Sequence, residues 1–174
     1  DWTGIAAGFV QNQQVMYPDG ALEKPILTGD TLELLGSRIL TVCDQDDGVV
    51  DGMMTDPRQC RFNPDDLPGC VDDEPGVGCV TNAQRTAINT VYAGPMVNGE
   101  AIYPGFTYGG ERDPGGWDSW VVSSEQRRAA GVPNAQYAFG TELFKYFVFS
   151  DPDWDYTTYD FSTWNEDSAP TASL

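Results

Sequence analysis

The segment from Cys43 to Met54 constrains the fold of this chain most strongly. It has the sequence CDQDDGVVDGMM, in which four carboxylates fall within eight residues and two glycines interrupt them. Like charges packed this closely repel one another, so an ordered segment of this composition requires a cation. Carboxylate and carbonyl oxygens are hard ligands, which are typical of calcium sites rather than of zinc or copper sites. The segment therefore predicts a calcium-binding loop.

The spacing of the aspartates indicates which groups bind the ion. Three aspartates are three and four residues apart, and a glycine follows the second and the third of them. Glycine takes backbone angles that other residues avoid, so the chain can coil around an ion and offer main-chain carbonyls. We predict that Asp46 points outward. The predicted calcium ligands are the side chains of Asp44, Asp47 and Asp51 and the carbonyl oxygens of Val49 and Met53.

The segment has two alternatives to a calcium-binding loop of this kind, an EF-hand and an acidic turn without a metal. The EF-hand pattern does not fit, because Gly48 as the loop glycine would make Cys43 the first ligand. With Gly52 in that role, the twelfth position would be Arg58. The other alternative is a solvated acidic turn without a metal. The placement of the glycines and the flanking cysteine favour calcium.

The four cysteines lie between positions 43 and 79. Zinc is the competing interpretation, but the chain contains no C-x2-C pair and no histidine. An even number of cysteines favours two disulfides and an oxidising compartment. Four cysteines allow three pairings, and the one that makes two small sequential loops is Cys43–Cys60 with Cys70–Cys79.

Composition excludes several classes of protein. At 174 residues the chain suits one domain with a real core. Its net charge of −18 makes nucleic acid and anionic membranes poor partners, and no apolar run is long enough to span a bilayer. Without histidine the chain cannot form a Ser-His-Asp triad, a His-ligated zinc hydrolase or a Cys-His protease. The start at Asp1 suggests an excised or processed segment.

Apolar spacing predicts an α+β fold that is mainly helical, with long loops and one small β-hairpin. A helix over residues 31–43, with Asp30 or Thr31 as its N-cap, leads directly into the acidic loop. Another starts at a T-x-x-Q capping box, Thr81–Gln84, and ends at Tyr92. Residues 55–80 have few apolar side chains, so disulfides and metal must order them. Two further helices are predicted over residues 2–16 and 135–149. The second of these has Phe139, Leu143, Phe147 and Val148 on one side. A hairpin is predicted over residues 96–103, around Asn98–Gly99.

The acidic loop also carries a family resemblance. C-D-x-x-D-G-x-x-D-G, followed by the sequence DPRQCRFNP over residues 56–64, resembles the calcium loop of the tannase and feruloyl esterase family. Weaker similarities to the same family occur at residues 1–3, 91–95, 103–106, 116–120 and 147–154. The resemblance implies a secreted serine ester hydrolase of the α/β-hydrolase fold, in which this loop belongs to an inserted lid domain.

The resemblance implies roles for the whole chain. Residues 1–164 would be the substrate-covering, calcium- and disulfide-stabilised lid, and residues 165–174 the linker back to the hydrolase core. The partners would be that core and an aromatic ester substrate, and the location would be extracellular or periplasmic. The catalytic triad would lie outside this chain, so the isolated chain is predicted to be inactive. The resemblance supports the same two disulfides. The rival interpretation is a free-standing, calcium-stabilised extracellular binding module.

Two tryptophans follow a loop rich in glycine and proline. Trp117 and Trp120 are suited to stacking on an aromatic ring of a substrate, although tryptophan side chains more often pack in the protein core. In the resembling lids this region lies over the active site, so Trp117 is the predicted substrate contact. Ser123–Ser124 has no general base nearby in sequence and is predicted to cap a short helix. Paired carboxylates suited to a glycosidase are expected by chance in so acidic a chain. The sequence leaves open which aromatic ester is cleaved.

Overall fold

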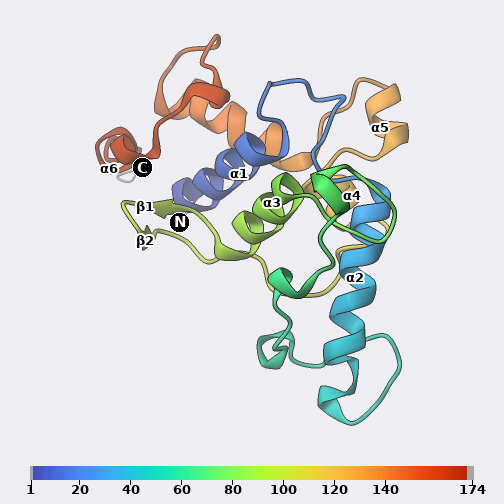
Figure 1. The fold of residues 1–174 in the computed structure, drawn as a ribbon. Helices are drawn as coiled ribbons and strands as arrows, with labels where there is room; N and C mark the ends of the chain where they lie inside the picture. Colours follow the sequence, from blue (N-terminus) through green and yellow to red (C-terminus); the bar gives the residue numbers. More distant parts are fainter. Residues whose placement is uncertain (1, 172–174) are drawn as a thin grey trace.

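Helix α1 (Trp2–Met16) lies at the centre of a helical body in the computed structural model, which describes residues 2–171 (Figure 1). It packs against α3 and against the helical segment that follows residue 134. Small residues on its inner face, including Ala6, Ala7 and Val10, are buried and let these helices approach closely. The predicted helix over residues 2–16 is confirmed.

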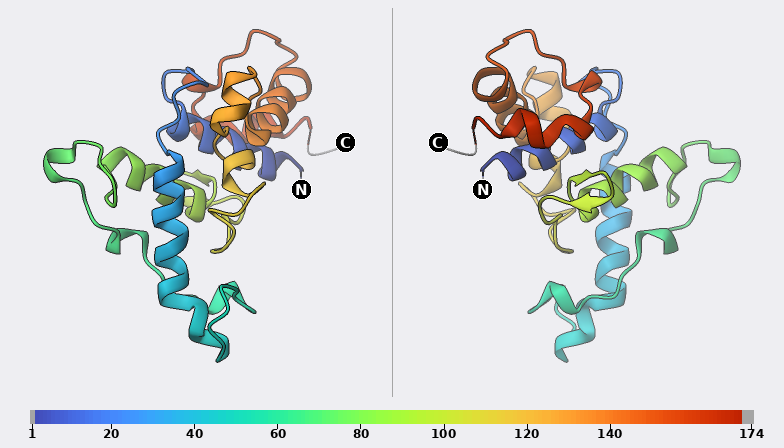
Figure 2. Two further views of the ribbon diagram at one scale, coloured as in Figure 1. Left: turned by 90° about the vertical axis from the view of Figure 1, so that its right-hand side faces the viewer. Right: turned by 90° about the vertical axis from the view of Figure 1, so that its left-hand side faces the viewer.

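Helix α2 (Gly29–Cys43) leaves this body and carries the acidic loop at its far end (Figure 2). Its buried face contains Leu32, Leu35 and Ile39. The prediction of Asp30 or Thr31 as N-cap is wrong, because the helix begins two residues earlier. Thr28 Oγ1 accepts from the N–H of Thr31 at 3.3 Å, and the N–H of Thr28 donates to Thr31 Oγ1 at 3.4 Å. This reciprocal pair satisfies free N–H groups at the helix start.

Helix α3 (Asn82–Ala93) begins at the predicted capping box. Thr81 Oγ1 accepts from the N–H of Gln84 at 3.2 Å, and Gln84 Oε1 accepts from the N–H of Thr81 at 2.9 Å. The predicted hairpin follows as strands β1 (Met96–Val97) and β2 (Glu100–Ala101), which pair antiparallel. Its turn residues, Asn98 and Gly99, both have positive φ, as a type I′ turn requires.

The helical segment over residues 135–148 differs from the prediction. It is wound partly as π-helix, over Tyr137–Thr141 and Phe144–Val148, so its inward positions do not follow the α-helical period. Phe144 is buried, whereas Phe139 and Phe147, which were predicted to lie on one side of the helix, are exposed. Gly140 sets the close approach to α1, since a Cβ at this position would lie 2.7 Å from Phe9 Cβ.

Buried amide side chains fix the register between α1 and this segment. Asn12 Nδ2 donates to Gln136 Oε1 at 3.2 Å. Gln13 and Asn134 exchange two hydrogen bonds, of 3.2 and 2.9 Å. All four side chains are buried, and buried amides that bond in this way favour one arrangement over its neighbours.

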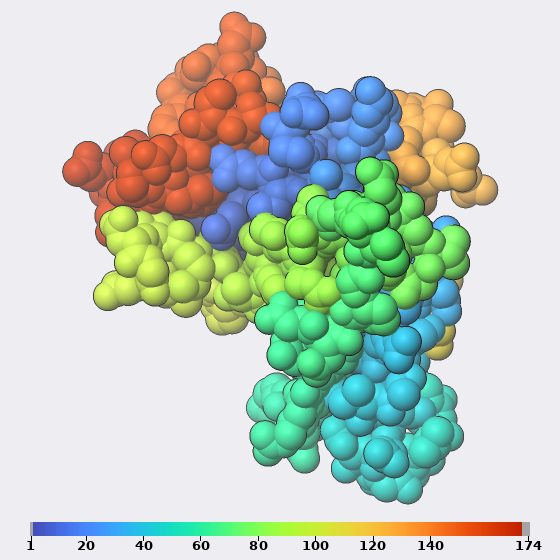
Figure 3. All heavy atoms as spheres, in the orientation of Figure 1, coloured from blue at the N-terminus to red at the C-terminus, as the bar shows by residue number. Residues whose placement is uncertain are grey.

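The rest of the chain completes the body (Figure 3). Helices α4 (Trp117–Trp120) and α5 (Glu125–Ala129) are short, and Ser124 caps α5 as predicted. Helix α6 (Trp164–Ser168) closes the C-terminal part, where Trp164 stacks on Phe144. The tail is therefore helical and packed through Ser168, and residues 172–174 lie outside the described part. The predicted fold class, mainly helical with a small antiparallel sheet and two disulfides, is confirmed.

No helix within residues 2–171 combines the length and apolarity that crossing a bilayer requires.

Candidate functional site

Two disulfides, one around the acidic loop and one after it, confirm the predicted pairing. Cys43, the last residue of α2, is bonded to Cys60, 17 residues later. Cys70 is bonded to Cys79, nine residues later. The first crosslink ties both ends of the acidic loop to the tip of α2.

Asp44 organises the loop from its buried position. Its Oδ1 accepts hydrogen bonds from the N–H groups of Asp51 at 3.3 Å and Gly52 at 2.9 Å. Gly52 has φ +82°, a left-handed backbone conformation that would be strained for a residue with a side chain. Asp51 Oδ1 in turn accepts from the N–H of Met53 at 3.0 Å. The carboxylates of Asp44 and Asp51 are therefore turned onto the loop's own backbone.

Asp47 makes the most contacts of the predicted ligands. Its Oδ1 accepts from the N–H of Val49 at 3.0 Å, and its Oδ2 accepts from the hydroxyl and the N–H of Thr55 at 2.7 and 3.2 Å. The Thr55 hydroxyl, followed by these N–H groups, holds the pKa of Asp47 below its ordinary value. Asp46 is exposed, as are Asp47 and Asp51, so the outward direction of Asp46 stays a prediction.

The donor set suits calcium in type, because it consists of carboxylate and carbonyl oxygens. The carboxylates do not converge, however. Within residues 2–171, no three His, Cys, Asp or Glu side chains are grouped closely enough to hold a metal ion. Calcium binding through Asp44, Asp47, Asp51, Val49 and Met53 therefore stays a prediction.

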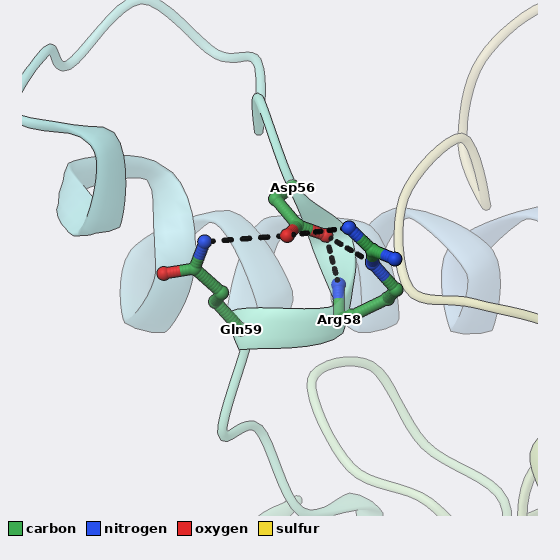
Figure 4. Close-up of polar contacts among 3 residues, drawn as sticks. All are labelled: Asp56, Arg58 and Gln59. Carbon is green, nitrogen blue, oxygen red and sulfur yellow. Dashed lines mark hydrogen bonds and ion pairs between the residues drawn. The ribbon is translucent and has the colours of Figure 1, made fainter.

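A polar turn follows the loop and leads to Cys60. Asp56 caps the 3-10 turn Pro57–Gln59 and holds Arg58 through bonds of 2.7 and 2.9 Å (Figure 4). Gln59 donates to the same carboxylate at 3.2 Å. The Arg58 side chain, followed by that of Gln59, lowers the pKa of Asp56 well below its usual range. These bonds shape the segment that brings Cys60 back to Cys43.

The two tryptophans of α4 have different surroundings. Trp117, the predicted substrate contact, is only 4% exposed and packs against Tyr92, with ring centroids 5.3 Å apart. Trp120 is 43% exposed and stacks on Phe139, which is 61% exposed, with centroids 6.2 Å and planes 20° apart. Phe9 supports Trp120 from α1 at 6.4 Å. The exposure of Phe139 was not predicted from the sequence. Phe139 lies in a π-helical stretch, whereas the prediction assumed the α-helical period.

Glu111 is a second feature that sequence reasoning missed. Its side chain is 1% exposed, and its Oε1 accepts from the Tyr92 hydroxyl at 2.7 Å and from the N–H of Gly109 at 2.7 Å. Burial, and then the Glu111 charge, raise the pKa of the Tyr92 hydroxyl far above its ordinary value, so that it remains a donor. No motif or spacing in the sequence marks this pair.

Ser123 does not form a nucleophilic site. Its hydroxyl donates to the carbonyl of Val132 at 2.7 Å, and its N–H donates to the Tyr17 hydroxyl at 3.0 Å. The residue is buried, and its contacts connect α5 to the end of α1. This agrees with the structural role predicted for the segment.

A family model described as tannase and feruloyl esterase matches residues 2–173. The chain belongs to the tannase and feruloyl esterase family. It is 28% identical over 169 residues to an uncharacterized esterase of Xanthomonas campestris pv. campestris, covering 93% of this chain and 27% of that protein. It is 30% identical over 161 residues to the probable feruloyl esterase B of Emericella nidulans, covering 83% of this chain and 28% of that protein. This places it in the context of carboxyl-ester hydrolases.

Solved structures agree with this family at the level of the fold. Feruloyl esterase B from Aspergillus oryzae has a TM-score of 0.71 at 22% identity, covering 99% of this chain and 31% of that one. An esterase from the same species has a TM-score of 0.70 at 21% identity, covering 98% and 30%. The tannase-family chain therefore spans between a quarter and a third of the length of these relatives.

Proposed function

We propose that this chain is the substrate-covering, calcium-binding lid domain of a secreted carboxyl-ester hydrolase that acts on aromatic acid esters. The observation that carries the proposal is the family match over residues 2–173, together with a span of 27–31% of the relatives named above. An α/β-hydrolase core of the same enzyme is the proposed partner, into which this domain is inserted.

The absence of histidine determines which part of the enzyme supplies the catalytic groups in this proposal. A serine hydroxyl is a weak nucleophile and needs an adjacent general base, usually histidine. None of the 174 residues is a histidine, so the core must supply the nucleophile and its base. The lid contributes by covering the reacting ester and excluding water from it.

The exposed pair Trp120 and Phe139 supports an aromatic substrate. Exposed aromatic rings are suited to stack on a ferulate-like ring, and such contacts add about 0.5–1.5 kcal/mol beyond the area they bury. Trp117 begins the helix that carries Trp120 and is buried, and a substrate contact through its own ring stays a prediction. In this proposal Trp120 offers the accessible indole, and the ring of Phe9 supports it from α1.

Calcium is proposed to bind the acidic loop through the residues predicted from the sequence. The carboxylates of Asp44, Asp47 and Asp51 and the carbonyls of Val49 and Met53 would hold the ion, which would neutralise their mutual repulsion. The two disulfides fit an oxidising compartment, which supports secretion.

The test of the lid role uses the complete enzyme that contains this segment. Trp120→Ala and Phe139→Ala should each raise KM for methyl ferulate about 2- to 10-fold, the loss of one ring contact, while the acyl-enzyme still forms. The matched control is Tyr146→Ala, which removes an exposed ring from the same helical segment. Unchanged KM in both ring variants would contradict the proposal that this surface meets the substrate.

A further inference from the structure

Glu111 is a buried carboxylate without a cationic partner. Within residues 2–171 the ion pairs are Asp56–Arg58 and Glu33–Arg112, and Glu111 belongs to neither. A buried charge of this kind is costly unless hydrogen bonds compensate for it. Glu111 Oε1 receives two, from the hydroxyl of Tyr92 and the N–H of Gly109, both at 2.7 Å.

The first of these bonds fixes an aromatic ring that supports the tryptophan helix. The ring of Tyr92 lies 4.6 Å from that of Tyr108 and 5.3 Å from that of Trp117, measured between centroids. Trp117 begins α4, and Trp120 ends it. Tyr92 therefore packs against the first residue of α4, the short helix whose last residue is the exposed Trp120.

The second bond holds the loop against the acidic region. Gly109 has φ +111°, and a Cβ at this position would lie 3.0 Å from Met54 Cε. A cavity of about 230 Å³ adjoins this contact, and Gly52, Met54 and Glu111 are among its lining residues. This space would let the loop shift if nothing tied it to α3. The bond from Tyr92 to Glu111 is one tie between the loop and α3, beside the bond from the N–H of Phe106 to the carbonyl of Val91 at 3.1 Å.

We propose that Glu111 is a positioning residue for the aromatic surface: through Tyr92 and Trp117 it positions α4, the helix that carries Trp120. The inference rests on the proposed function, in which Trp120 faces the substrate. The charge itself is not needed for this role, because the amide oxygen of glutamine accepts the same two hydrogen bonds. Leucine has nearly the same volume and accepts none.

The experiment compares Glu111→Leu, Glu111→Gln and Tyr92→Phe in the complete enzyme, with methyl ferulate and an aliphatic methyl ester as substrates. In Glu111→Leu and Tyr92→Phe, KM for the ferulate should rise about 3- to 10-fold while kcat and the aliphatic KM change less than about 2-fold. Glu111→Gln should restore the original KM. Arg112→Ala is the matched control, because it removes the neighbouring side chain and its exposed ion pair with Glu33.

The outcomes separate this inference from the proposed function. If Trp120→Ala leaves the ferulate preference unchanged, the lid role of this surface fails, and the inference fails with it. If Trp120→Ala changes that preference but folded Glu111→Leu does not, only the positioning role is overturned. A loss of thermal stability without a change in the ratio of KM values would show a merely structural carboxylate. Should Glu111→Leu not fold, Tyr92→Phe decides, since it removes a single hydroxyl.

Discussion

Asp44 accepts a hydrogen bond from the N–H of Gly52 at 2.9 Å and thereby closes the acidic loop across eight residues of chain. The carboxylate is buried, while most of the loop around it is exposed. The loop thus has an internal anchor before any ion is considered. Asp47 makes a second anchor through Thr55. A cation would have to draw these carboxylates together and compete with the N–H groups that they now accept from.

Calcium is expected to stabilise the folded chain. A ligand at 100 times its Kd stabilises by about 2.7 kcal/mol, which for a chain of this size raises Tm by about 5–10 °C. Addition of EDTA should reverse the increase. The measurement is thermal unfolding followed by circular dichroism, with and without calcium.

A pair of substitutions tests the predicted ligand set. Asp47→Asn should abolish most of the calcium-dependent increase in Tm, whereas Asp46→Asn, at an exposed neighbour, should change it far less. Both substitutions remove one negative charge, so a general effect of charge would affect both equally. An unchanged Tm after EDTA, or equal effects of the two substitutions, would contradict the site.

The Cys43–Cys60 crosslink should contribute to both stability and calcium affinity. Replacing both cysteines with serine opens a loop of 17 residues, which costs about 3 kcal/mol in the chain-entropy model. It also frees one end of the acidic loop, so calcium affinity should fall. The Cys70–Cys79 double serine variant is the control, because its loop lies outside the acidic segment. It should lose similar stability, as measured by urea unfolding, and keep its calcium affinity.

Local patterns were predictable where one short segment determines the structure. The T-x-x-Q capping box fixed the start of α3, and Asn98–Gly99 fixed the hairpin turn. The N-cap of α2 was missed because Thr28 pairs with a threonine at N3 rather than with a glutamate or glutamine. Both kinds of cap satisfy the same free N–H groups, but only the second has a recognisable pattern.

Features that depend on tertiary packing were not predictable. The π-helical winding that exposes Phe139 accompanies the close contact of Gly140 with α1, and no periodicity in the sequence encodes it. The bond between Tyr92 and Glu111 joins residues 19 positions apart on different elements. At the acidic loop the sequence indicated the coiling but not the direction of each carboxylate, since backbone N–H groups compete with a cation for the same oxygens.

Asp56 should titrate below ordinary aspartates because Arg58 and Gln59 hydrogen-bond to its ionised form. A lowered folded-state pKa means that its contribution to stability is present above the unfolded pKa of about 3.9 and is lost as pH falls through the folded pKa. Arg58→Ala should raise the pKa of Asp56 toward its ordinary value. Arg61→Ala, which removes a nearby exposed arginine, should leave it unchanged. Carboxyl carbon chemical shifts from NMR, recorded from pH 6 downward, would measure both, and equal pKa values in Arg58→Ala and the parent chain would contradict the assignment.

The isolated chain should hydrolyse no ester above the buffer rate. A nucleophilic serine requires a base beside it, and the chain has no histidine to serve as one. Ser123 is buried and its hydroxyl donates to the carbonyl of Val132, so it is not free to attack an ester. The assay incubates the chain with p-nitrophenyl acetate and methyl ferulate, using the complete enzyme as positive control. Saturable turnover that a serine-directed phosphonate abolishes would place a nucleophile within these 174 residues, and the core could then no longer be the sole source of the catalytic serine.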